Sequence, residues 1–356
     1  MDIPDDLEFQ QSDLFNQRGD NVMKDINIEP TTYRLRRRLL SFPTVFSFVV
    51  VALLCIFLIT RFNVDVGSTL GRIQEADPFL YVLAFLIYYT TFLFRGARWR
   101  LLLHNAGVAE NAPLPSILTA GRLVLVGWMI SSITWFRMGD AFRAYAYSRE
   151  SGAPLARIVG TVVAERVLDV ATVFVLLTIA FVVSYFNTDT QLSTSFLLVG
   201  TGLLVPTMAI VAIFYFFGGS VNQYLPQRLK ETYDVFRQGT LNSFHHLTRL
   251  TVLSFLGWVV EIGRLYLVIY SMGLETDMGL IMFTMVANAL LSAVPVTPGG
   301  LGIVETGMTG LLTIAMVRED ALSVVLLDRS ISYLSVLVFG SVAFAIHERA
   351  RLRGRR

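Results

Sequence analysis

Charged side chains occur inside apolar stretches of this sequence, where only pairing or a polar function makes them tolerable. Glu165, Arg166 and Asp169 lie within the long apolar run 158–186. On a helix, Glu165 and Asp169 share one face, and Arg166 is three residues from Asp169. A charge at the centre of a membrane helix costs about 2.5–3.5 kcal/mol on insertion scales, so such groups usually pair or face water. These residues are therefore candidates for a polar site.

A second set of charges precedes this run. Arg137, Asp140 and Arg143 repeat every three residues, a spacing that lines one face of a helix. Arginines 137, 143 and 166 together exceed what the neighbouring acids need. A guanidinium group binds phosphate through two N–H donors at once. We therefore interpret these arginines as a candidate site for a phosphate group.

Further charges occur towards the C-terminus. Glu261 and Arg264 are three residues apart in an apolar run, so a structural ion pair and a functional role both remain open. A helix that begins after Gly299-Gly300-Leu301-Gly302 could hold an anion on its free backbone N–H groups. The candidate substrate-binding residues are Arg137, Asp140, Arg143, Glu165, Arg166, Asp169, Gly299, Gly300, Gly302, Glu305, Asp328 and Arg329.

The elements that position these residues are membrane helices. Of the 356 residues, 54% are hydrophobic and 16% are charged, and the mean hydropathy is +0.59. A helix needs about 20 apolar residues to cross a bilayer. The composition and the runs predict a polytopic integral membrane protein. The apolar runs are 43–60, 78–94, 113–136, 158–186, 195–217, 250–272, 279–296, 303–317 and 321–346.

Basic residues beside these runs indicate the orientation, because lysine and arginine concentrate in cytoplasmic loops. Arginines 34, 36, 37 and 38 place the N-terminal arm inside, and Arg95, Arg98 and Arg100 place the loop after the second run inside. The later basic loops then fit only if 113–136 is a re-entrant hairpin. A broken helix there would use Pro113, Pro115, Gly121 and Gly127.

A basic C-terminal tail makes a second hairpin necessary, over 279–317, broken at Pro295, Pro298 and the glycines. The predicted fold is all-α: six full spans and two re-entrant hairpins in an inverted repeat, with both termini cytoplasmic. Such repeats place a substrate site at their interface. The predicted parts are a polar arm (1–41), a membrane domain (42–346) with halves of about 43–186 and 195–346, an interfacial amphipathic helix (221–245) and a basic tail (347–356).

Four stretches of this sequence together resemble a known family. They are FRMGDAFR (136–143), AERVLD (164–169), TPGGLGIVE (297–305) and DRSISY (328–333). They are similar to the flippase-like membrane domain of lysylphosphatidylglycerol synthases, a family that also includes archaeal dolichol-pathway proteins. The resemblance covers roughly 43–346, without the soluble aminoacyl-transfer domain of full synthases. Thr134, Trp135 and Phe136 stand where the family often has asparagine and proline.

The resemblance implies movement of a phospholipid or lipid-linked sugar between leaflets, through a charged cavity between the two hairpins. It also implies a location in the plasma membrane of a bacterium or archaeon. The expected partners are lipids with an anionic, aminoacylated or glycosylated head group. Glu305, Glu165 and Asp169 could balance a cationic head group or bind a coupling proton. No P-loop motif occurs in the sequence, so the energy source would be a gradient, mass action or a partner.

Three other functions remain open: a membrane-embedded enzyme acting on a lipid phosphate, a non-transporting scaffold of a cell-envelope complex, and a small-ion transporter. The sequence contains no clear nucleophile–base pair or metal-ligand cluster, which disfavours the enzyme. We expect no catalytic residue, metal, cofactor or nucleic acid. A homo-oligomer or an envelope-biosynthesis partner stays open.

Overall fold

The computed structural model describes residues 66–110, 112–134, 138–186, 226–293 and 297–353. Within these ranges the regular structure is helical, and no strand occurs. Four helical stretches are long and apolar enough to cross a membrane. The chain is therefore an all-α, multi-pass membrane protein, as predicted. The four stretches are α5 (Pro78–Asn105), α8 (Leu155–Phe186), α11 (Leu247–Ser271) and the helix that runs from Arg318 to Arg349.

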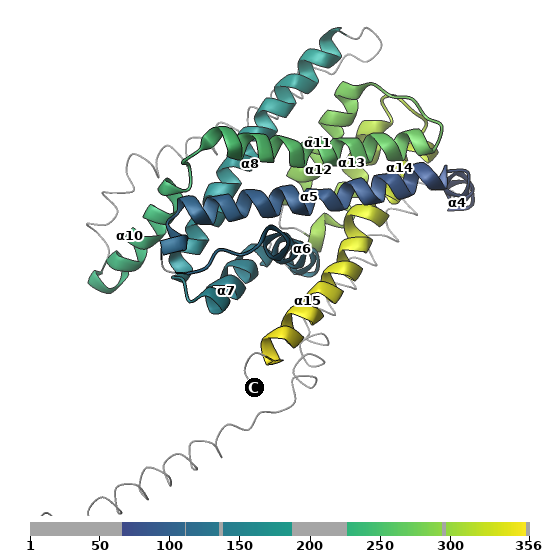
Figure 1. Cartoon of the computed structure of the whole chain (residues 1–356). Coiled ribbons are helices and arrows are strands. Elements are labelled where there is room, and N and C mark those ends of the chain that lie inside the picture. The colour runs from purple at the N-terminus through teal and green to yellow at the C-terminus, as the bar shows by residue number, and fades with distance from the viewer. Residues whose placement is uncertain (1–65, 111, 135–137, 187–225, 294–296, 354–356) are drawn as a thin grey trace, which may run out of the picture. The chain divides into compact units, whose positions relative to one another are not determined.

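Each of these stretches covers one expected span, at 78–94, 158–186, 250–272 and 321–346. The two other expected spans, 43–60 and 195–217, lie outside the described residues. α5 and α11 lie side by side and run antiparallel (Figure 1). The pairing is visible at both ends, since the Asp77 amide donates to the Ser271 carbonyl and Asn105 donates to the Ser243 carbonyl.

The last membrane helix changes its geometry near its middle. α14 (Arg318–Arg329) passes into a π-helical turn, η4 (Ser330–Leu334), which is followed by α15 (Ser335–Arg353). A π turn inside an α-helix is rare and is often found at functional sites. Here it begins directly after Arg329, one of the candidate site residues.

The segment expected to form the first hairpin begins differently from the prediction. α6 (Ile117–Ile133) is one unbroken helix with Ser116 at its N-cap, so Pro113 and Pro115 precede it. The predicted break within 113–136 is therefore wrong. The chain instead turns after α6 and continues into α7 (Gly139–Ser151).

The glycines of α6 allow close helix packing instead of a break. A Cβ on Gly96 of α5 would lie 2.5 Å from the backbone nitrogen of Gly121, and a Cβ on Gly139 would lie 1.7 Å from the carbonyl oxygen of Gly127. Small residues at helix crossings are typical of membrane proteins, where backbones approach closely. Gly121 therefore seats α6 against α5, and Gly127 seats it against α7.

The segment expected to form the second hairpin is broken at Gly299, Gly300 and Gly302, as predicted from the sequence. α12 (Met278–Ala293) precedes the break, which contains the short helix η3 (Pro298–Gly300), and α13 (Ile303–Leu312) follows it. Gly299, Gly300 and Gly302 have φ angles of 61°, 71° and 83°. Side chains other than glycine rarely adopt these angles, so the glycines are needed for the turn.

Three shorter helices complete the described part. α4 (Val66–Gln74) precedes α5, and η1 (Val108–Glu110) follows it. α10 (Gln227–Asn242) lies within the segment 221–245, for which an amphipathic helix is predicted; residues 221–225 lie outside the described residues. α10 packs on the beginning of α8, because a Cβ on Gly160 would meet the Phe236 carbonyl and a Cβ on Gly239 would meet that of Arg157.

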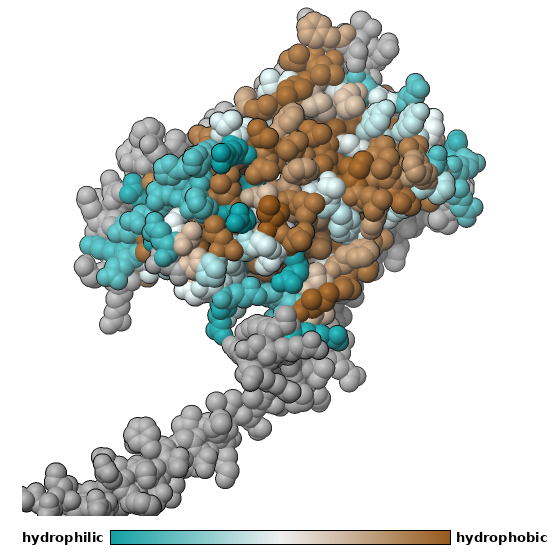
Figure 2. Space-filling model, in the orientation of Figure 1, coloured by the Kyte–Doolittle hydropathy of each residue, from teal (hydrophilic) through white to brown (hydrophobic). Residues whose placement is uncertain are grey.

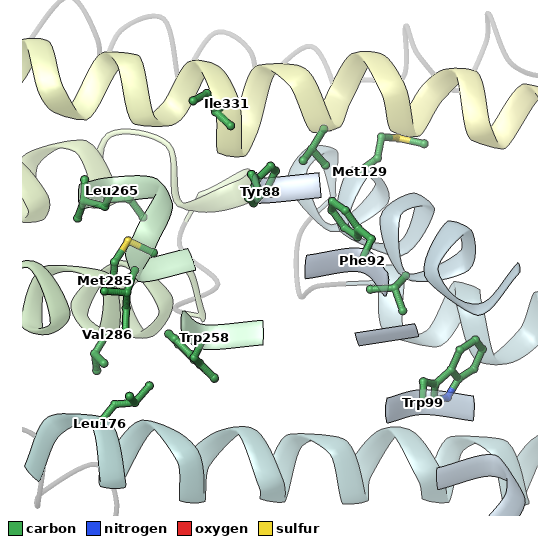
Figure 3. Packing of buried hydrophobic residues seen from close by; sticks show 14 of the residues in the cluster. Tyr88, Phe92, Trp99, Met129, Leu176, Trp258, Leu265, Met285, Val286 and Ile331 are labelled. Atoms are coloured by element: carbon green, nitrogen blue, oxygen red, sulfur yellow. The ribbon is translucent and has the colours of Figure 1, made fainter. Parts of the chain in front are cut away.

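A large apolar core joins these helices (Figure 3). Tyr88, Phe92 and Trp99 of α5 are buried in it, together with Trp258 of α11 and Met129 of α6. On the face drawn in Figure 2, apolar side chains cover the middle of the molecule, and hydrophilic residues gather around α10 and around α4. An exposed apolar surface of this size suits contact with lipid.

Candidate functional site: a buried chain of ion pairs

Two arginines that the sequence placed in a cytoplasmic loop lie inside the helix bundle. α5 extends to Asn105, and both Arg95 and Arg98 are buried on it, whereas Arg100 is exposed. Their use as orientation signals was therefore wrong. The residues between Arg95 and Asn105 include no proline, and the apolar pattern continues past Arg98, which could have indicated a longer helix.

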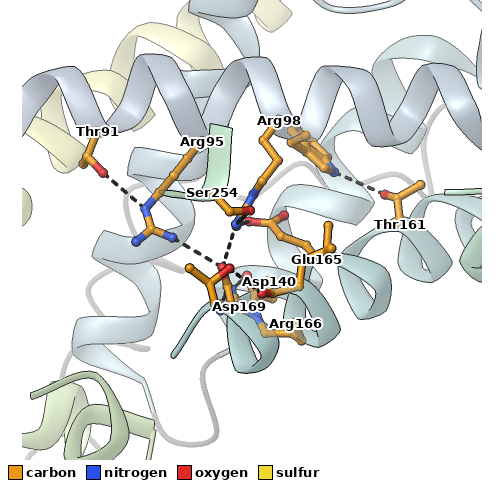
Figure 4. A network of polar contacts seen from close by, with 12 residues as sticks. Thr91, Arg95, Arg98, Asp140, Thr161, Glu165, Arg166, Asp169 and Ser254 are labelled. Atoms are coloured by element: carbon orange, nitrogen blue, oxygen red, sulfur yellow. Dashed lines mark hydrogen bonds and ion pairs between the residues drawn. The ribbon is translucent and has the colours of Figure 1, made fainter. Parts of the chain in front are cut away.

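Arg98 joins α5 to α8 and α11. Its Nη2 donates to Glu165 at 2.8 Å, and its Nη1 donates to Asp169 at 2.7 Å and to Ser254 at 2.9 Å (Figure 4). The sequence predicted that Glu165 and Asp169 share a helical face, and this common partner confirms it. Paired, hydrogen-bonded charges of this kind are tolerable inside a membrane protein.

α7 and α8 add two more arginines to the same acids. Arg143 lies 2.7 Å from Glu165 and 3.2 Å from Asp140, while Arg166 lies 2.8 Å from Asp140 and 3.1 Å from Asp169. The expectation of unbalanced arginines is not met at these two positions, since each has two acidic partners. Arg137, the third arginine of the predicted group, lies outside the described residues.

Arg143 nevertheless differs from the other arginines of this group. Its side chain is buried, and its guanidinium carbon lies 5.1 Å from the ring centre of Trp99. Although two acids lie within ion-pair distance, none of its three nitrogens donates a hydrogen bond to a residue in the part of the chain that the structure describes. Buried donors in that state are uncommon and call for a partner. Arg143 therefore has hydrogen-bonding capacity that its present neighbours do not use.

A second group of charges lies between α11 and α14. Arg264 donates to Glu261 at 3.3 Å and to Asp328 at 2.8 and 3.2 Å. It also lies over the ring of Tyr88, 4.8 Å from its centre. The predicted local pair between Glu261 and Arg264 is confirmed, and it extends to a third helix.

Arg95 connects the two groups. Its Nη2 lies 3.2 Å from Glu261, and its Nη1 lies 4.0 Å from Asp169. One chain of ion pairs thus runs from α7 through α8, α5 and α11 to α14. Among the described residues it contains the arginines 95, 98, 143, 166 and 264 and the acids Asp140, Glu165, Asp169, Glu261 and Asp328.

One end of this chain is accessible, and the other is not. The Arg166 side chain is 36% exposed and that of Asp140 is 23% exposed, whereas both Arg264 and Asp328 are 0% exposed. An ionic ligand would therefore reach the chain of ion pairs first at Arg166 and Asp140.

The remaining candidate residues form a separate group around the glycine turn. Arg329 donates to the Glu305 carboxylate at 2.6 Å and to the Gly299 carbonyl at 3.0 Å. The other oxygen of Glu305 accepts from the backbone N–H of Gly302 at 2.6 Å. The N-terminus of α13, where the sequence predicted an anion, is thus occupied by a carboxylate of the protein itself.

The glycine turn also meets the end of α6. The Tyr333 hydroxyl donates to the Ser132 carbonyl at 3.1 Å, and a Cβ on Gly299 would lie 3.2 Å from Ser132. The two helix pairs that replace the expected hairpins therefore touch through their turns. In the described ranges, no group of three or more His, Cys, Asp or Glu residues could hold a metal ion.

The helices and the buried ion pairs define a multi-pass membrane protein with a polar interior. The chain belongs to a family described as the lysylphosphatidylglycerol synthase TM region, whose sequence pattern matches residues 44–340. The match covers both groups of charges and confirms the family resemblance that the four sequence stretches indicated.

Archaeal proteins are among its relatives. A UPF0104 membrane protein of Methanocaldococcus jannaschii is 30% identical over 230 residues, which are 63% of this chain and 96% of that protein. One from Pyrococcus horikoshii is 21% identical, covering 78% of this chain and 90% of its own length. Glycosyltransferase AglD of Haloferax volcanii is 23% identical over 90% of this chain and 58% of its own length. These matches agree with a multi-pass protein of the plasma membrane.

Proposed function

We propose that this chain moves a lipid with a phosphate in its head group between the two leaflets. The substrate would be a phospholipid or a lipid-linked sugar. The observation that carries the proposal is Arg143, a buried guanidinium whose donors make no hydrogen bond to any described residue, next to the accessible pair Arg166–Asp140. A phosphate that displaces Asp140 from Arg143 and Arg166 would gain charge-assisted hydrogen bonds to both arginines.

The names of related proteins support the choice of substrate. The family is named after the synthases of a modified phosphatidylglycerol, and one relative is a glycosyltransferase. The first name concerns a phospholipid, and the second concerns the transfer of a sugar. We extend this to the present chain only as a proposal: its substrate carries the phosphate of a lipid, and its tails remain in the bilayer.

The topology belongs to the same proposal. α6 and α12 are apolar but shorter than a full span, and each is followed by a turn and a further helix. We propose that α6–α7 and α12–α13 are re-entrant pairs entering from opposite sides, related by an inverted repeat with six full spans and both termini cytoplasmic. Non-helical backbone at membrane depth is tolerated where it is buried in protein, as around Gly299.

Leaflet exchange in vesicles tests the function. The protein is reconstituted in phosphatidylcholine vesicles with a trace of labelled phosphatidylglycerol or of a labelled polyprenyl-phosphate sugar. A membrane-impermeant quencher then reports how fast the label changes leaflet. Arg166→Ala should lower the rate by about tenfold or more, because a charge-assisted hydrogen bond contributes about 1.5–3 kcal/mol. Arg149→Ala, on an arginine of α7 outside the chain of ion pairs, is the matched control.

The same vesicles separate this function from its alternatives. Chromatography of the extracted lipid detects conversion to a new species, which would replace translocation by an enzymatic activity on the lipid. If the lipid neither changes leaflet nor reacts with the folded wild-type protein, the translocation proposal fails and a scaffold is favoured. Size-exclusion profiles of every variant show whether a loss of exchange is merely a loss of folding.

A further inference from the structure

Among the described residues, the chain of ion pairs contains as many arginines as acids. Its two ends differ in whether they need Arg95 to balance their charges. At the α11–α14 end, one arginine, Arg264, faces two buried acids, Glu261 and Asp328. The second positive charge needed there comes from Arg95, whose Nη2 lies 3.2 Å from Glu261. Without Arg95, this end would hold one uncompensated negative charge, which is costly in a buried site.

Counted over the described residues alone, the α7–α8 end is already balanced without Arg95. Its three arginines and three acids contact one another at 2.7–3.2 Å. An arginine added to this end would therefore be an uncompensated positive charge, available to an anion. The six residues are Arg98, Arg143, Arg166, Asp140, Glu165 and Asp169.

Arg95 lies where it can serve either end. Its Nη1 is 4.0 Å from Asp169, while its Nε donates to Thr91 at 3.3 Å and its guanidinium carbon lies 4.7 Å from the ring centre of Trp128. Glu261 and Asp169 therefore both lie within ion-pair distance of the same guanidinium. The 4.0 Å distance between Arg95 and Asp169 is the longest of the ion-pair distances given for this chain of ion pairs.

The apolar runs outside the described residues do not alter this balance. Residues 43–60 and 195–217 contain no Asp, Glu, Lys or Arg. These two runs therefore cannot supply a charge to Glu261 in place of Arg95.

Building on the proposed translocation, we propose that Glu261 binds a coupling proton, which releases Arg95 to the Asp169 side to receive the negative charge of a lipid phosphate. The proton adds to a carboxylate oxygen of Glu261, and no covalent bond breaks. The positive charge of Arg95 is then balanced by one negative charge of the head group. One proton and one anionic charge enter together, and the membrane interior remains neutral.

The surroundings of Glu261 make the two events cooperate. Arg95 and Tyr88 face it from α5, Arg264 flanks it on α11, and Asp328 lies beyond Arg264 on α14. α8 contributes Asp169 beyond Arg95, and α12 contributes the uncharged Met285 beside Arg264. Glu261 thus has two arginine partners, Arg95 and Arg264. An anion that draws Arg95 away leaves Glu261 with one of them.

Binding of an anionic lipid at different pH values tests the proposal. The full chain is placed in phosphatidylcholine nanodiscs, and the affinity for tail-labelled phosphatidylglycerol is measured by energy transfer. In the wild type, linkage of one proton to lipid binding should raise the affinity by about tenfold for each unit by which the pH falls. Glu261→Gln imitates the protonated acid, so its affinity should be high and independent of pH. Glu75→Gln, on the exposed end of α4, should keep the wild-type slope.

A second variant covers the case in which Glu261→Gln fails to fold. Arg95→Gln removes the shuttling charge, so it should bind the lipid weakly at every pH and without a slope. A wild-type affinity that does not depend on pH would overturn the proposal, as would a slope that persists in Glu261→Gln or Arg95→Gln. If the lipid changes leaflet but its affinity does not depend on pH, the translocation proposal stands and the proton coupling is excluded. If the affinity depends on pH but the lipid does not change leaflet, the proton-linked binding stands and the translocation proposal fails.

Discussion

Asp328 and Arg329 are neighbours in the sequence, yet they belong to different groups of interactions. Asp328 accepts two hydrogen bonds from the Arg264 guanidinium, while Arg329 donates to the Glu305 carboxylate and the Gly299 carbonyl. One dipeptide of α14 thus holds the buried chain of ion pairs on one side and the glycine turn on the other. A shift of α14 would disturb both groups together.

The first prediction concerns the cost of breaking the innermost pair. Arg264→Met leaves Asp328, which is 0% exposed, as a buried charge without its partner. The free energy of unfolding should fall by about 3–5 kcal/mol. Thermal unfolding of the detergent-solubilised protein measures this loss. Adding Asp328→Asn removes the stranded charge, so the double variant should regain part of it. Equal stability of the single variant and the wild type would contradict the structural role.

The second prediction compares Arg98, whose N–H groups donate hydrogen bonds to described residues, with Arg143, whose N–H groups do not. Arg98→Lys removes hydrogen bonds to Glu165, Asp169 or Ser254, because one ammonium cannot span all three. It should therefore lower the melting temperature.

Arg143→Lys keeps the charge beside Glu165 and loses no existing hydrogen bond. Its stability should stay near that of the wild type, whereas leaflet exchange of a phosphate-bearing lipid should fall by about tenfold. The two measurements together are the test, since a purely structural Arg143 would lose stability and exchange in parallel.

The third prediction concerns the contact between the two turns. Tyr333→Phe removes the hydrogen bond to the Ser132 carbonyl, which should cost about 0.5–1.5 kcal/mol of stability. Amide hydrogen exchange should also quicken in the peptides that contain Gly299 and the end of α6. Tyr145→Phe, on the exposed side of α7, is the matched control. Unchanged exchange in both peptides would show that the hydroxyl does not hold the turns together.

The fourth prediction tests the close packing of α6 and α7. A Cβ on Gly139 would lie 1.7 Å from the Gly127 carbonyl oxygen, so Gly139→Ala should prevent correct packing and lower the yield of monodisperse protein. A Cβ on Gly263 of α11 meets nothing within 4 Å. Gly263→Ala should therefore be neutral or stabilising by up to about 1 kcal/mol, because alanine favours a helix over glycine. Similar behaviour of the two variants would disprove the contact.

The fold class and four of the spans could be predicted because hydrophobic length is a property of each segment alone. Close pairs along one helix could be predicted for the same reason. Asp140–Arg143, Arg166–Asp169 and Glu261–Arg264 all form with a spacing of three residues. The glycine turn before α13 was also predicted, since only a local backbone conformation was needed.

Contacts between helices were beyond what a single sequence shows. Arg98 and Glu165 are 67 residues apart, and nothing in their own segments says that they meet. The sequence predicts Arg95 and Arg98 to be loop residues because arginine after an apolar run usually marks the membrane boundary. It predicts Gly121 and Gly127 to be helix breakers because glycine occurs both at breaks and at close helix contacts, and only the neighbouring helix distinguishes the two uses.

The π-helical turn of Ser330–Leu334 fixes the rotational phase of the rest of the helix. If the same residues formed a regular α-helix instead, everything after the turn would be rotated relative to α14. Ser335 would leave Tyr89, to which it is hydrogen-bonded at 2.8 Å, and His347 would leave Glu150, which it meets at 3.3 Å. The extra residue of the π turn allows a single helix to contact Arg264 and Glu305 through α14 and also Tyr89 and Glu150 through α15.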